Sequence, residues 1–230
     1  MRGEEIRKPL VLFSELCLTA AALIGLFMVY QSWFTNEVAQ VQAVSISNEL
    51  DAALPKTSAT SSLSDKPEVV KLTSAPLESI GRIYIPRLKD DVWATPIIVG
   101  VGERALASGV GYYPGAALPG GFGNFSLAAH RATHGEPFAR FEKLRSGDLV
   151  YVETTSGWFT YELLENKKIS DSATWVLDAK PKGIDLQSDQ IITLTTCDPR
   201  WNSVRRWAWW GVLVDSSAEA PEAVGGSNDL

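Results

Sequence analysis

Apolar residues follow two different patterns along the chain, and each pattern predicts a different kind of structure. Residues 10–34 are apolar at most positions, with Glu15 as the only charged residue. From about Ile80 onward, apolar residues occur in short runs separated by Gly, Pro, Asp and Ser, which is typical of β-strands joined by turns. The predicted strands cover residues 82–86, 92–99, 124–130, 149–153, 158–165, 190–197 and 204–214, with helical spacing at 102–109 and 138–144. Many short strands with little helix predict a mostly β fold, either an antiparallel barrel or a sandwich.

The apolar segment 10–34 is predicted to cross a membrane, because it exceeds the roughly 20 residues that span a hydrocarbon core. Basic residues precede it, namely Arg2, Arg7 and Lys8, and Glu37 follows it. This asymmetry places the N-terminus in the cytoplasm. A cleaved signal peptide is the alternative, but its apolar core would cover roughly 7 to 15 residues before a small-residue cleavage site. We therefore favour an uncleaved anchor.

The rest of the sequence divides by composition. Residues 35–78 are rich in Ala, Ser, Thr, Val and Gln and are broken by prolines. A helix is conceivable at 36–54, but the region as a whole predicts an extracellular spacer. The resulting organisation is a cytoplasmic N-terminus at 1–9, the anchor, the spacer, one folded domain at 79–215 and a disordered tail at 216–230. A net charge of −6 excludes a basic nucleic-acid-binding protein.

Cys197 is the first candidate for chemistry. The chain has 2 cysteines, and the other one, Cys17, lies in the apolar segment. The folded domain therefore has no partner for a disulfide with Cys197. Cys197 ends the apolar run 191–196, and the next predicted strand carries Arg205 and Arg206. A thiol at the end of a buried strand and beside a cation suggests a nucleophile.

A histidine that could assist such a thiol ends another predicted strand. The chain has 2 histidines, and His130 closes the strand at 124–130, whereas His134 is expected in a loop without catalytic duty. A cysteine nucleophile needs an imidazole to exchange protons and a cation or amide hydrogens to stabilise an oxyanion. Each residue taken alone also suits an ordinary structural role. Their joint pattern favours an enzyme.

Two motifs resemble those of the sortases, the membrane-anchored cysteine transpeptidases of Gram-positive bacteria. Residues 193–197 read TLTTC, which resembles the TLxTC cysteine signature, and residues 123–131 read GNFSLAAHR, which is similar to the histidine motif. The sequence YPGAALPG at 113–120 and CDP at 197–199 most resemble class E sortases of actinobacteria. Ala129 replaces the glycine that usually precedes the histidine. The resemblance covers residues 80–214 and implies a closed antiparallel or mixed β-barrel with a few short helices.

The resemblance also implies roles for individual residues. Cys197 would be the nucleophile, His130 the acid and base, and the arginine of the next strand the oxyanion-stabilising group. The class E pattern assigns that arginine to Arg206, with Arg205 as the alternative, and strand alternation puts these two on opposite faces. Substrate contacts are expected from Thr196, Tyr112 and Tyr113, which flank the motifs.

The implied reaction cleaves a C-terminal LPxTG-like or LAxTG-like sorting motif between Thr and Gly through a Cys197 thioester. An amine of a peptidoglycan precursor or a pilin then accepts the sorted surface protein. No cofactor is expected, and 2 histidines with one thiol outside the apolar segment fall short of a zinc site unless carboxylates complete the ligand set. Calcium regulation stays open, since Asp90 and Asp91 are a weak cue. The alternatives are a membrane-anchored cysteine hydrolase and a non-catalytic surface binding module.

Overall fold

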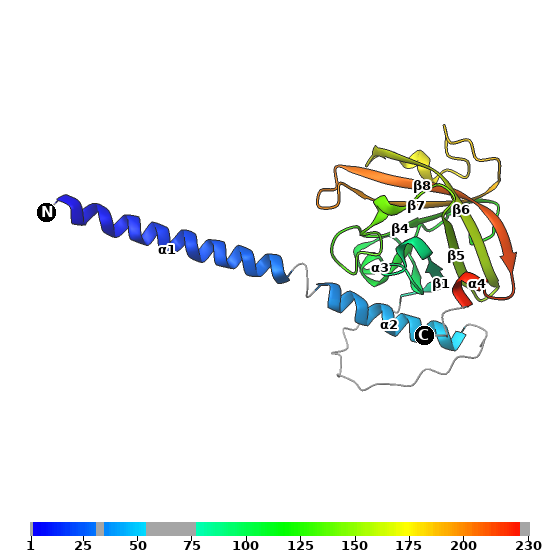
Figure 1. Cartoon of the computed structure of the whole chain (residues 1–230), viewed down its shortest axis with the longest axis horizontal. Helices are drawn as coiled ribbons and strands as arrows, with labels where there is room; N and C mark the ends of the chain where they lie inside the picture. The colour runs from blue at the N-terminus through cyan, green and yellow to red at the C-terminus, as the bar shows by residue number, and fades with distance from the viewer. Residues whose placement is uncertain (1, 31–34, 54–76, 226–230) are drawn as a thin grey trace.

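Eight strands close into one barrel in the computed structural model, which describes residues 2–30, 35–53 and 77–225 (Figure 1). The strands are β1 (Ser79–Tyr84), β2 (Thr95–Val99), β3 (Val110–Tyr112), β4 (Gly123–Ala128), β5 (Leu149–Thr154), β6 (Gly157–Ser170), β7 (Gln190–Asp198) and β8 (Arg205–Ser217). Around the barrel their order is β1-β2-β3-β4-β7-β8-β6-β5. The pairs β2/β3 and β4/β7 are parallel and the other pairs are antiparallel. The predicted closed, mixed barrel with short helices is thus confirmed.

The structure differs from the expected elements at two places. Strand β3 was not predicted, because its three residues are too few to show an alternating pattern. The helical spacing at 138–144 belongs to a turn with one short 3₁₀ helix, Phe141–Lys143, rather than to an α-helix. Phe138, Phe141 and Leu144 are all buried at intervals of three residues, which is the period of a 3₁₀ helix.

The barrel interior holds the main core, and a second apolar cluster lies outside it. Buried residues of this second cluster are Val176, Ile191, Ala208 and Trp210. The 3₁₀ helix η4 (Thr174–Leu177) covers them, and the ring of Trp175 stacks on that of Trp210 with centroids 5.9 Å apart. Strands β7 and β8 are therefore buried on both faces. This explains why the run 191–196 and the tryptophans of β8 lack a polar, solvent-facing side.

The N-terminal helix α1 (Arg2–Val29) extends away from the barrel (Figure 1). Its segment Val11–Val29 has a mean hydropathy of 2.1 and none of it is buried against the rest of the chain. Apolar side chains on this segment, among them Leu12, Phe13 and Leu26, are exposed. This length and composition suit a membrane span, and they also suit a signal sequence near an N-terminus.

The first half of the predicted spacer is the helix α2 (Thr35–Ala53), which packs against the barrel near β1, β2 and the short helix α3 (Glu103–Ser108). Leu50 is buried in this contact. The buried guanidinium of Arg82 on β1 donates to Asp51 Oδ1 at 2.5 Å and to the Ser47 carbonyl at 2.6 Å. The small, weakly apolar residues of α2 gave little sequence signal for this docking. The remaining spacer, 54–76, lies outside the described residues.

The predicted tail also contains ordered structure. Strand β8 continues to Ser217, and Glu222–Gly225 forms a short helix, α4. Residues 226–230 lie outside the described part of the chain. The folded domain therefore extends a few residues further than the sequence pattern indicated.

Candidate active site

Strand pairing decides which arginine shares a face with the thiol. In the antiparallel ladder of β7 and β8, Cys197 lies directly opposite Arg206, and Asp198 lies opposite Arg205. Side chains of directly opposed residues project to the same face, with Cβ atoms about 4.5–5.5 Å apart. Arg206 is therefore the neighbour of Cys197, whereas Arg205 belongs to the face of Asp198. This agrees with the expectation, from the alternation of side chains along a strand, that Arg205 and Arg206 lie on opposite faces.

His130 reaches this end of the barrel from the other side of β7. In the parallel ladder of β4 and β7, Ala128 pairs with Thr195, so the next residues run on side by side toward His130 and Cys197. The Ala129 amide donates to the Thr195 carbonyl at 3.1 Å, and the Thr196 hydroxyl donates to the Ala129 carbonyl at 2.8 Å. Neighbouring strands lie about 4.8 Å apart. The adjacent strands β4, β7 and β8 thus bring His130, Cys197 and Arg206 to one end of the barrel.

The surroundings of His130 favour its neutral form. Burial, followed by the charge of His134, lowers the pKa of His130, and the carboxylate of Glu103 opposes this shift. The two imidazole rings lie with centroids 5.2 Å apart. His130 Nε2 is buried and has no hydrogen-bond partner among the described residues. An unsatisfied buried nitrogen is costly in a structural role, but it suits a group that exchanges a proton with substrate.

Cys197 is a free, half-buried thiol, and Arg206 is half-buried beside it. Arg206 Nη1 donates to the carbonyls of Ser203 and Arg205, both at 3.1 Å. The guanidinium is therefore held against the turn between β7 and β8. Arg206 thus lies opposite Cys197 on the same face of the sheet, where a cation can stabilise negative charge that develops near the sulfur.

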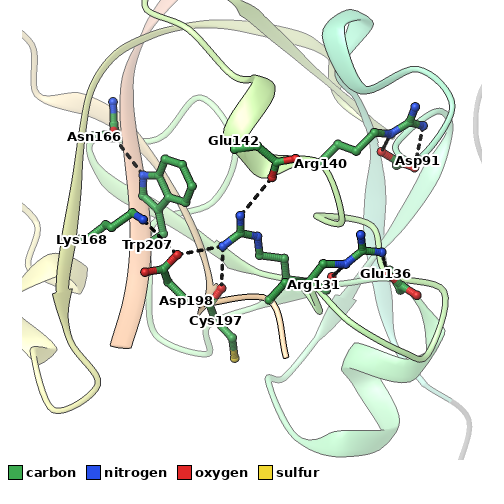
Figure 2. A network of polar contacts seen from close by, with 11 residues as sticks. Asp91, Arg131, Glu136, Arg140, Glu142, Asn166, Lys168, Cys197, Asp198 and Trp207 are labelled. Carbon is green, nitrogen blue, oxygen red and sulfur yellow. Dashed lines mark hydrogen bonds and ion pairs between the residues drawn. The ribbon is translucent and has the colours of Figure 1, made fainter. Parts of the chain in front are cut away.

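A network of charged side chains lies on the opposite face of β7 (Figure 2). Arg131 Nη1 pairs with Asp198 Oδ1 at 2.9 Å, and Arg131 Nη2 pairs with Glu142 Oε2 at 3.0 Å. Lys168 Nζ lies 3.2 Å from Asp198 Oδ1, and both cations contact the ring of Trp207. Burial tends to raise the pKa of Asp198, but hydrogen bonds from Lys168 and Arg131 and their charges lower it below its ordinary value. Asp198 is therefore ionised at neutral pH.

Sequence reasoning missed this network, although a signal for it is present. Arg131 directly follows His130, and Asp198 directly follows Cys197. These two residues carry opposite charges at equivalent places in the two motifs. Only the parallel pairing of β4 with β7 shows that they meet.

The three residues expected to contact substrate occupy different environments. Tyr112 is buried in the core, where its ring lies 6.0 Å from that of Phe125, and its hydroxyl donates to the Ala116 carbonyl. Thr196 is also buried, with its hydroxyl bonded to β4. Tyr113 is half-buried, and its hydroxyl lies 3.3 Å from Thr195 Oγ1. Of the three, Tyr113 has the most accessible position.

Within the described residues, no group of three His, Cys, Asp or Glu side chains is arranged to hold a metal ion. Asp90 and Asp91, the weak cue for calcium, both pair with Arg140, at 2.9 Å and 2.6 Å. Both carboxylates are thus engaged by the same guanidinium.

Comparison with known proteins shows the family to which this chain belongs. Residues 83–214 match the sortase domain. The chain is 35% identical over 222 residues to sortase SrtE1 of Streptomyces coelicolor, covering 92% of this chain and 58% of that protein. It is 33% identical over 225 residues to sortase SrtE2 of the same organism, covering 92% of this chain and 85% of that protein. The chain thus spans somewhat more than half the length of SrtE1.

Solved structures give the same result for the barrel. The crystal structure of sortase E1 from Streptomyces coelicolor with a tripeptide in its active site superimposes with a TM-score of 0.59 at 34% identity, over 64% of this chain and 96% of that one. Sortase E from Streptomyces avermitilis gives a TM-score of 0.56 at 36% identity, over 64% of this chain and 97% of that one. The chain therefore belongs to the sortase family of cysteine transpeptidases.

Proposed function

We propose that this chain is a membrane-anchored sortase that cleaves an LAxTG-like or LPxTG-like C-terminal sorting motif between Thr and Gly. It then joins the threonine carbonyl to an amine of the cell wall or of a pilin. The observation that supports this proposal best is the placement of His130, Cys197 and Arg206 at one end of three adjacent strands. The LAxTG form of the motif is what the resemblance of residues 113–120 and 197–199 to class E sortases implies.

The first half of the reaction forms a thioester. The Cys197 thiol gives its proton to neutral His130, and the sulfur attacks the threonine carbonyl carbon. Negative charge moves to the carbonyl oxygen, where Arg206 stabilises it. The Thr–Gly C–N bond then breaks as His130 returns the proton to the leaving glycine nitrogen. The lowered pKa of His130 keeps its ring neutral and therefore available in the first transfer, although as a weaker base, and makes its protonated form a stronger acid in the second.

The second half reverses the order of these events. An incoming amine attacks the thioester carbon, and His130 takes a proton from its nitrogen. The oxyanion forms again beside Arg206, and its collapse expels the Cys197 sulfur. The new amide joins the sorted protein to its acceptor, and the thiol regains the proton from His130. A water molecule in place of the amine would give hydrolysis instead.

Tyr113 is our choice for a substrate contact. It is the first residue of the loop between β3 and β4, and its hydroxyl lies 3.3 Å from Thr195 Oγ1 on the same strand as Cys197. Tyr112 and Thr196 are better placed to support the site from within, because both are buried and bonded to neighbouring carbonyls.

Helix α1 is proposed to anchor the protein as a single membrane span, with the barrel outside the cell. The exposed apolar surface of Val11–Val29 supports this location, since none of this segment is buried inside the described part of the chain. The basic residues before the segment orient the N-terminus toward the cytoplasm. The barrel would then meet surface proteins that carry the sorting signal, together with peptidoglycan precursors or pilin amines.

Peptide transfer by the full-length chain in detergent tests the function. The protein is incubated with an LAxTG peptide and triglycine, and products are identified by mass spectrometry. A joined peptide supports transpeptidation, and cleavage without joining supports the hydrolase alternative. If neither product forms, and Cys197→Ala leaves every cellular phenotype unchanged, the result favours the alternative of a non-catalytic surface binding module.

A further inference from the structure

Two charged residues meet directly behind the catalytic pair. Arg131 follows His130, Asp198 follows Cys197, and their side chains form an ion pair of 2.9 Å. Only 8% of the Arg131 side chain and 3% of the Asp198 side chain are exposed. In Figure 2 the sulfur of Cys197 lies on the side of the strand away from this pair. The pair therefore contacts the backbone that carries the thiol, and leaves the thiol free.

The Arg131–Asp198 ion pair lies beyond the last residues that β4 and β7 pair through their backbones. The last register pair of β4 and β7 is Ala128 with Thr195. Beyond it, the Ala129 amide still reaches Thr195, and Thr196 then bonds back to Ala129 through its side chain. His130 and Cys197 follow this point. Cys197 is still paired with Arg206 of β8, but without a further link nothing beyond Ala129 would fix the end of β4, which carries His130, against β7.

The Arg131–Asp198 ion pair supplies that link one residue beyond His130 and Cys197. His130 is flanked by Ala129, which is bonded to Thr196, and by Arg131, which is bonded to Asp198. On β7, Cys197 is flanked by Thr196 and Asp198, which are the residues that make these two contacts. Arg131 Nη1 also lies 3.4 Å from the Cys197 carbonyl oxygen as a hydrogen-bond donor. Each catalytic residue is thus held between two side-chain contacts to the other strand.

The surrounding charges favour an ionised Asp198. Its carboxylate meets Arg131, Lys168 and, at 3.3 Å, Arg205. The ring of Trp207 lies against both Arg131 and Lys168, with the ring centroid 5.1 Å and 4.6 Å from their charged groups. Loss of the Asp198 charge would leave the buried guanidinium of Arg131 without its buried counter-charge, next to the partly exposed cations of Lys168 and Arg205.

We propose that the buried Arg131–Asp198 pair is a positioning device that fixes the ends of β4 and β7, so that His130 and Cys197 keep the alignment needed for proton transfer. This inference rests on the proposed function of the same site. Neither residue touches the substrate or the reacting atoms. Both act through the backbone of the residue that precedes them.

The experiment uses the full-length chain in detergent with Cys17→Ser as background, so that Cys197 is the only thiol. Asp198→Asn removes the charge but keeps the shape of the side chain. Arg131→Lys keeps the charge, but one nitrogen cannot replace a guanidinium that contacts Asp198, Glu142 and the Cys197 carbonyl. Asp148→Asn is the matched control. Asp148 is another buried carboxylate paired with an arginine, Arg87, and it precedes β5, which is not adjacent to β4, β7 or β8.

Two readouts separate positioning from stability, each taken at a temperature where circular dichroism shows every variant folded. The first is kcat and KM for peptide transfer. The second is the pH profile of Cys197 alkylation by iodoacetamide, which needs no sorting peptide. We expect Asp198→Asn to lower kcat at least tenfold with KM within threefold, and to shift the alkylation profile. Arg131→Lys should change kcat and the alkylation profile in the same direction, by a smaller factor. Asp148→Asn should lower the melting temperature and leave kcat and the alkylation profile unchanged.

A folded Asp198→Asn variant with a lower melting temperature but an unchanged kcat and alkylation profile would overturn the proposal. If Asp198→Asn does not fold, Arg131→Lys decides, and wild-type values for both readouts would likewise overturn it. A wild-type chain that joins no peptide refutes the proposed function instead. The alkylation profile still tests the ion pair in that case.

Discussion

Cys197 and Arg206 are directly opposed across the ladder of β7 and β8, whereas the adjacent Arg205 is opposed to Asp198 on the other face. Two consecutive arginines therefore have different surroundings. One lies beside the thiol, and the other joins the charged network behind it. This difference provides an internal control for the oxyanion role.

Arg206→Ala should lower kcat by about 10²–10³-fold, the usual loss when one oxyanion donor is removed. KM should change little, because the interaction forms mainly in the transition state. Arg205→Ala should lower kcat by only a few fold, since Arg205 touches Asp198 at 3.3 Å and is exposed. Steady-state kinetics of peptide transfer measure both. A larger loss for Arg205→Ala than for Arg206→Ala would reverse the assignment.

His134→Asn should raise the pKa of His130 toward its ordinary value. Burial is the main cause of the lowered pKa and remains in the variant, but the charge of His134 is removed. Asn is the suitable replacement because His134 has φ of 53°, a left-handed conformation that Asn tolerates. The chain has 2 histidines, so the variant gives a single imidazole signal in an NMR titration. An unchanged or lower pKa would show that the two rings do not interact.

Acidification should destabilise the fold through His130. Its folded-state pKa is lowered, so the unfolded chain binds a proton more readily. This contribution to stability is therefore complete well above the ordinary pKa of about 6.5, and is lost as pH falls through that value toward the folded pKa. Thermal melts between about pH 7.5 and pH 5.5 should show a smaller decrease for His130→Gln than for the wild type. Equal decreases in melting temperature for His130→Gln and the wild type would mean that groups other than His130 take up the protons.

Asp51→Asn should loosen α2 from the barrel. Arg82 is buried, and its contact with Asp51 is the ion pair that ties α2 to β1. The hydrogen bond to a charged group contributes about 1.5–3 kcal/mol, so amides of α2 should exchange at least about tenfold faster. Hydrogen exchange followed by mass spectrometry measures this, with β7 as the internal reference. Unchanged protection of α2 would mean that Leu50 and its neighbours suffice for docking.

The sequence predicts those features of the structure that depend on residues near one another along the chain. A mostly β fold and the strands β7 and β8 follow from apolar runs bounded by turn residues, although β8 continues to Ser217; the family and its closed barrel follow from the motifs around His130 and Cys197. Strand β3 is too short to leave a pattern, and the aromatic spacing after Phe138 fits a 3₁₀ turn as well as a helix.

The ion pair of Arg131 with Asp198 could not be predicted in the same way. It joins residues 67 positions apart, and depends on β4 lying parallel to β7. Docking of α2 through Arg82 is non-local for the same reason. A single sequence indicates which residues carry charge, but it does not indicate which strands are neighbours.

Intact-mass spectrometry of the full-length chain with an LAxTG peptide detects the thioester itself. We expect a covalent adduct on Cys197 with the mass of the peptide cleaved after Thr, and its conversion to a joined product when triglycine is added. Cys197→Ala should form neither species. Joined product from Cys197→Ala, or a wild-type chain that forms no adduct and no product, would contradict the account.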